Sequence, residues 1–193
     1  MEAGTALRKE IVKLCNNLQL EQDIVYQRAE FLIENYHDFV WFDTEKARQK
    51  FNAQNAAFQK DPDAAILYLA DFDPSDDKNN IFTKMFLLFE AKWLKELVDS
   101  AMDYVGSFSD DGDLYCSILS NELYKEKIKI YAQMKQFNVG KTTLYKRRVE
   151  AVLLFGIALW GKLIPYWLEL YHLSECRPKK LHVAESYSPD NNK

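Results

Sequence analysis

Positive charge is concentrated in residues 121–150 of a chain that is otherwise acidic. This segment has eight basic and three acidic residues, a net charge of +5, whereas the rest of the chain carries −9 and the whole chain −4. Clustered lysine and arginine side chains bind phosphate groups, in nucleic acids by displacing counterions. The distribution therefore favours a phosphate-rich partner for this segment, although solvated helices with a cationic face have the same composition.

Two acidic clusters elsewhere are candidates for metal-dependent catalysis. Asp71, Asp73, Asp76 and Asp77 fall in one expected loop, and Glu96, Asp99 and Asp103 share a helix face at spacings of three and four. Carboxylates so placed can hold magnesium in an all-helical nucleotide pyrophosphatase. The sequence contains no Glu-Glu-x-x-Glu motif to complete such a centre. We therefore expect a binding protein and not an enzyme, with magnesium-dependent pyrophosphatase activity as the catalytic alternative.

Histidine and cysteine supply no further candidate site. The histidines are His37, His172 and His182, and the cysteines are Cys15, Cys116 and Cys176. Their spacing fits neither zinc ligands nor a disulfide framework, so we expect no metal, no cofactor and a reducing compartment. The first residues, MEAGTALRKEIVKLC, lack the basic-then-apolar order of a signal peptide, and a cytoplasmic location is expected.

Composition and hydrophobic spacing predict an all-α chain. Of its 193 residues 48% are hydrophobic, and only 6 are glycine and 5 proline, too few for a turn-rich sandwich or barrel. Periodicity and capping residues predict helices at about 6–19, 20–42, 44–58, 62–70 and 81–105. These helices form the expected first domain, an acidic helical bundle over residues 1–106 that serves regulation, oligomerisation or partner binding.

The basic segment reads as two helices joined by a short turn. Residues 122–137 have helical periodicity, Asn138-Val139-Gly140 interrupt it, and a second helix begins at Lys141 and continues through at least Phe155. Asn138 tolerates the left-handed conformation that ends a helix, and glycine is acceptable as the N-cap. Two helices around a three-residue turn with glycine are the plan of a helix-turn-helix.

A projection of the second helix separates an apolar arc from a polar one. The apolar arc has Leu144, Tyr145, Val149, Ala151, Val152 and Phe155, and the polar arc has Thr142, Thr143, Lys146, Arg147 and Glu150. Hydroxyls and cations at a helix N-terminus suit base edges and phosphates in a major groove. We therefore expect Thr142, Thr143, Lys146 and Arg147 to read bases. Lys129, Lys135, Lys141 and Arg148 are expected to contact phosphates, although Arg148 projects into the apolar arc and can instead extend to solvent or pair with an acid.

These residues also carry a family resemblance. Residues 115–156 resemble the sigma-factor region-four type of helix-turn-helix, and more narrowly the ArpU-like phage late transcriptional regulators. The resemblance rests on Ile130, the run Phe137-Asn-Val-Gly-Lys-Thr-Thr-Leu-Tyr-Lys146, Ala151 with Phe155, and Gly156. In that family the turn ends in serine, where this chain has Gly140. The resemblance implies sequence-specific binding of double-stranded DNA, control of transcription and contact with RNA polymerase.

The second predicted domain, residues 113–175, joins the helix-turn-helix to an apolar C-terminal part. Its uncharged run from Ala151 to Gly161 has eleven residues, whereas a membrane span needs about 20, so no membrane partner is expected. We expect a break in the helix near 161–165 and packing of residues 151–173 on the first domain or, in a homodimer, on a second protomer. The tail, residues 176–193, is expected to be mobile. A helical protein-interaction module that acts as an antagonist or adaptor without DNA is the main alternative function.

Overall fold

The computed structural model describes residues 8–41, 62–88, 91–108, 110–124 and 129–171, and these contain helices and no strand. The elements are α1 (Lys9–Asn17), α2 (Gln22–Trp41), α4 (Pro62–Asp71), α5 (Lys78–Leu88), α6 (Ala91–Gly106), α7 (Gly112–Leu123), α8 (Ile130–Gln136), α9 (Lys141–Ala158), η1 (Leu159–Leu163) and α10 (Ile164–Leu170). The prediction of an all-α chain is confirmed. The helices expected at 6–19, 20–42 and 62–70 correspond to α1, α2 and α4, whereas the helix at 44–58 lies outside the described residues.

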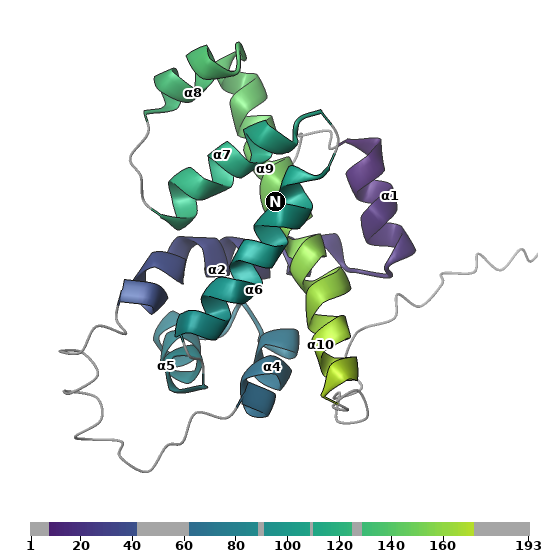
Figure 1. Ribbon diagram of the computed structural model, residues 1–193, viewed down its shortest axis with the longest axis vertical. Helices are drawn as coiled ribbons and strands as arrows, with labels where there is room; N and C mark the ends of the chain where they lie inside the picture. The colour runs from purple at the N-terminus through teal and green to yellow at the C-terminus, as the bar shows by residue number, and fades with distance from the viewer. Residues whose placement is uncertain (1–7, 42–61, 89–90, 109, 125–128, 172–193) are drawn as a thin grey trace, which may run out of the picture.

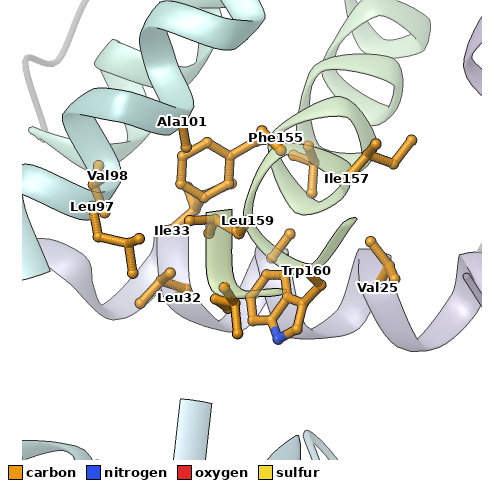
Figure 2. Close-up of a cluster of buried hydrophobic side chains, with 14 of the residues drawn as sticks. Val25, Leu32, Ile33, Leu97, Val98, Ala101, Phe155, Ile157, Leu159 and Trp160 are labelled. Atoms are coloured by element: carbon orange, nitrogen blue, oxygen red, sulfur yellow. The ribbon is translucent and has the colours of Figure 1, made fainter. Parts of the chain in front are cut away.

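Helix α9 is the central element, because its second half is buried on every side. Every residue from Glu150 to Ala158 is buried, and the helix packs against α2, α6 and α7. Figure 2 shows the ring of Phe155 between side chains of α2 and α6, beside Ile33 and Ala101. The approach to α2 requires glycine: a Cβ at Gly156 would lie 2.6 Å from Cγ1 and 2.9 Å from the carbonyl oxygen of Val25.

One large core unites residues from both predicted domains. Its buried side chains come from α1, α2, α4, α5 and α6 as well as from α7, α9 and α10. The boundary predicted near residue 106 therefore does not separate two cores. A second, small cluster consists of Leu114 and Ile118 of α7 and Leu144 of α9, with Met134, Phe137 and Val139 packed against them. This cluster holds α8 against α7 and α9, at the end of the molecule opposite α4 and α5 (Figure 1).

Two helix boundaries differ from the predicted ones. The helix expected over 122–137 is wrong: α7 ends at Leu123, and Lys129 before α8 has an extended backbone, with φ −61° and ψ 137°. The helical spacing of residues 130, 134 and 137 led to the prediction of one long helix, but these residues belong only to the short helix α8 and its C-cap. The helix expected over 81–105 begins three residues earlier, at Lys78, and its described parts are α5 and α6, with residues 89–90 outside the described part of the chain.

The C-terminal helix widens where a break was expected. Residues 159–163 form a π-helical turn and α10 continues from it, because Pro165 has no N–H to bond the carbonyl of Gly161 and its ring crowds that carbonyl. Helix 141–170 is long and apolar enough to cross a membrane by length and composition, but 67% of its most apolar window is buried inside the protein. Residues 151–160 are buried in the same chain, so they are not available to a second protomer.

Candidate nucleic-acid interface

The turn between α8 and α9 has the geometry that its residues predict. Asn138 has a φ of 51°, in the left-handed region, and the Val139 N–H donates to the carbonyl oxygen of Met134 at 3.0 Å. Gly140 is extended, with φ −75° and ψ 160°, and its carbonyl accepts the first hydrogen bond of α9 from the Leu144 N–H at 2.9 Å. The predicted left-handed Asn138 and N-cap Gly140 are therefore confirmed, and Val139 packs against Leu114, Ile118 and Leu144.

The first turn of α9 projects polar side chains into solvent. Lys141, Thr142 and Thr143 are exposed, and Lys146 one turn later is half-buried. Gly140 has no side chain with which to cap the N–H groups of this turn. Lys129 and Lys135, at the two ends of α8, are also exposed. Six of the eight residues predicted to contact DNA thus lie on the accessible surface of the α8–α9 unit.

Arg147 is turned toward the protein body instead of toward solvent. Its Nη1 donates to a carboxylate oxygen of Glu150 at 2.5 Å, and its Nη2 lies 3.4 Å from a carboxylate oxygen of Asp111. Burial by itself would lower the pKa of Arg147, but the hydrogen bond and the negative charge of Glu150 outweigh it and the pKa is raised. In this arrangement the guanidinium serves an internal ion pair, which differs from the predicted base-reading role.

Glu150 explains this arrangement, and its predicted exposure is wrong. The side chain is 0% exposed, and its carboxylate accepts hydrogen bonds from the Tyr115 hydroxyl at 2.9 Å and the Arg8 backbone N–H at 3.1 Å. Burial, together with the charge of Glu150, raises the pKa of Tyr115. The Arg8 guanidinium also pairs with Asp111. This charged layer ties the start of α1 and the loop before α7 to α9.

Arg148 pairs with acidic residues, which is one of the alternatives predicted for it. Its Nε donates to Glu122 at 2.6 Å, and its Nη1 lies 3.2 Å from Glu30 and 3.5 Å from the Tyr26 hydroxyl. Burial alone would lower its pKa, whereas the bond to Glu122 and the surrounding negative charge raise it. The predicted phosphate contact by Arg148 is not the arrangement observed, because the guanidinium joins α9 to α7 and α2 within the protein.

The acidic clusters have local structural roles. Asp73 accepts hydrogen bonds from the Ser75 N–H at 2.8 Å and hydroxyl at 2.7 Å, which lower its pKa, and Asp77 accepts from the Asn80 N–H at the start of α5 at 3.0 Å. Asp99 pairs with Lys95 and is 3.3 Å from the Tyr124 hydroxyl. Within the described part of the chain, no group of three or more His, Cys, Asp or Glu residues is arranged to hold a metal ion.

Sequence reasoning missed one exposed residue of the interface. Tyr145 was assigned to the apolar arc, but it is 48% exposed, and the Lys141 ammonium lies 5.9 Å from its ring centroid. The spacing could have indicated this exposure, because Tyr145 lies one helical turn after the exposed Lys141 and therefore on the same face of the helix. Ile130 and Tyr131, at the start of α8, are also exposed.

Comparison with known proteins found no relative of this chain. The chain matches no family model, no curated protein and no solved structure.

Proposed function

We propose that the chain is a sequence-specific regulator of transcription that binds double-stranded DNA through α7, α8 and α9. In this proposal α8 and α9 form a helix-turn-helix, and the first turn of α9 enters the major groove. The observation that carries the proposal is the exposure of Lys141, Thr142 and Thr143 on a helix whose other end is buried in the core. The small cluster shared by the three helices supports it, because it packs the turn against α7 and α9.

The exposed cations and hydroxyls divide into two roles. Lys129, Lys135 and Lys141 contact phosphates and displace counterions, which provides affinity without sequence preference. Thr142, Thr143 and Lys146 face the groove floor, where hydroxyl and ammonium groups hydrogen-bond to base edges. Arg147 and Arg148 act differently: their ion pairs with Asp111, Glu122 and Glu30 attach α9 to the rest of the protein, and Arg147 also pairs with Glu150 within the helix.

The buried second half of α9 holds the exposed first turn of the same helix in place. Because the helix continues without interruption from the exposed turn into the core, its reading end is already ordered before DNA binds. Such preorganisation reduces the entropy lost on binding. The body outside the basic segment is acidic, and it repels phosphates from other faces of the protein.

A binding experiment with charge-reversal variants tests this function. Duplexes are first selected from a random pool, and the affinity of the selected duplex is then measured by fluorescence anisotropy over a series of salt concentrations. We expect Lys141→Glu with Lys146→Glu to weaken binding at least about tenfold and to lower the salt slope by about one, for the phosphate contact of Lys141. The matched control is Lys13→Glu with Lys92→Glu, which makes the same charge change at exposed sites on α1 and α6.

The outcome separates the proposal from its alternatives. Equal affinities of the two double variants would contradict the assigned surface, provided that far-UV circular dichroism reports the same helix content for both. If no duplex is retained, the chain is better described as a protein-interaction module. The exposed Ile130 and Tyr131 beside Lys129 favour that second candidate, and they are also where contact with an RNA polymerase subunit would be sought. A homodimer formed through residues 151–173 would use the exposed side chains of Tyr166 and Leu170 in α10 and of Tyr171 after it.

A further inference from the structure

The ring of Tyr145 is exposed in a way that packing does not explain. Among the described residues Tyr145 belongs to neither hydrophobic cluster, although its neighbour Leu144 anchors the small one. Its side chain is 48% exposed on a helix surface otherwise formed by lysine and threonine. An aromatic ring held at a cationic surface is typical of a binding contact.

The neighbours of Tyr145 give its ring a defined place on the proposed reading face. Lys141, one turn earlier, lies over the ring with its ammonium 5.9 Å from the centroid, within the range of a cation–π interaction. Lys146 and Thr142 flank the position along the helix. The ring is therefore presented together with the groups assigned to base edges, and the cation that covers part of it is itself suited to a phosphate.

The chemistry of the major groove restricts what such a ring can contact there. Base edges in the groove present hydrogen-bond donors and acceptors, and their one apolar group is the C5-methyl of thymine. An apolar ring surface gains free energy by covering a methyl group but gains little by covering a polar edge without a hydrogen bond. We propose that Tyr145 is a specificity-determining residue that packs its ring on the methyl group of a thymine in the bound duplex.

This inference rests on the proposed DNA binding, and its test removes the methyl group alone. In the duplex selected from a random pool, each thymine is replaced in turn by deoxyuridine, which keeps every hydrogen-bonding group. Affinities are measured for the wild-type chain and for Tyr145→Ala. We expect one position at which the replacement weakens wild-type binding about fourfold, the effect of uncovering one methyl group. At that position the same replacement leaves the affinity of Tyr145→Ala unchanged.

Two further variants identify the part of the side chain that matters. Tyr145→Phe keeps the ring and should retain both the affinity and the deoxyuridine effect. Tyr131→Ala removes a more exposed tyrosine from α8 and should keep the deoxyuridine effect. Circular dichroism checks that all three variants keep the wild-type helix content.

The possible failures are distinguishable. If wild type and Tyr145→Ala lose equal affinity at every replaced thymine, the inference is overturned while DNA binding stands. If Tyr145→Phe weakens binding as much as Tyr145→Ala and no thymine is sensitive, the hydroxyl contacts a phosphate and the inference is again overturned. A chain that retains no duplex overturns the proposed function and this inference with it.

Discussion

The two halves of α9 have opposite surroundings. From Lys141 to Lys146 only Leu144 is buried, whereas from Glu150 to Ala158 every residue is buried. A helix with one apolar stripe usually lies on the surface of a core along its whole length. Here the same helix passes from a largely exposed first turn into the centre of the core, so that one end is anchored and the other is accessible.

The cations on α9 separate in the same way. Lys141 is exposed and Lys146 is half-buried, while Arg147 and Arg148 pair with carboxylates outside α9, namely Asp111, Glu122 and Glu30. Arginine suits the second role, because its planar guanidinium donates several hydrogen bonds at once and is less strongly hydrated than an ammonium. Only part of the positive charge on this helix is therefore held in ion pairs with the rest of the protein.

The largest effect is expected where the two halves of α9 meet. Glu150→Ala removes the acceptor of the Tyr115 hydroxyl and the Arg8 N–H and the counter-ion of Arg147. We expect the free energy of unfolding in urea to fall by about 3 kcal/mol, because donors and a charge are left without their partner inside the protein. Glu150→Gln keeps an acceptor and should lose less. Equal losses for the two variants would show that the charge of Glu150, and not its hydrogen bonding, is what stabilises this layer.

Two glycines, one just before α9 and one in its buried half, give a matched comparison with a smaller effect. Gly156→Ala forces a methyl group against Val25 and Ala29 of α2, and we expect it to cost about 2 kcal/mol despite the better helix propensity of alanine. Gly140→Ser meets open space, since nothing lies within 4 Å of its Cβ position. Serine can cap α9, so we expect a gain of a few tenths of a kcal/mol, roughly the difference between the two as N-caps. Urea unfolding measures the free energy of unfolding of both variants. Similar values for the two would mean that α2 and α9 can move apart at little cost when Gly156 is replaced.

A third comparison distinguishes the anchoring cation Arg147 from its neighbour Lys146. Arg147→Ala should lower the free energy of unfolding by about 1–2 kcal/mol, because Glu150 keeps its two other donors. Lys146→Ala should leave stability nearly unchanged but weaken duplex binding more than Arg147→Ala does. If Arg147→Ala had the greater effect on affinity at unchanged stability, Arg147 would leave its ion pairs to contact DNA, as the sequence first indicated.

Local features of this chain were predictable, and the network around Glu150 was not. The turn followed from Asn138 and Gly140, whose conformational preferences act within a few residues. The helix projection placed Glu150 with the polar side chains, because it contains no information about Tyr115 or Arg8, which other helices bring to the same place. Tyr145 was assigned to the core by its residue type, yet the cluster at this end of α9 covers only the side of Leu144.

The amino-acid order alone determined that the chain is helical, where its turn lies and that positive charge gathers around that turn. Those properties depend on backbone preference, side-chain type and short-range spacing. Only the tertiary structure decided which cations are held in ion pairs, because carboxylates of α2, α7 and the loop before α7 reach Arg147 and Arg148. It likewise decided that both predicted domains share one core, since burial of α9 depends on surfaces supplied from both sides of residue 106.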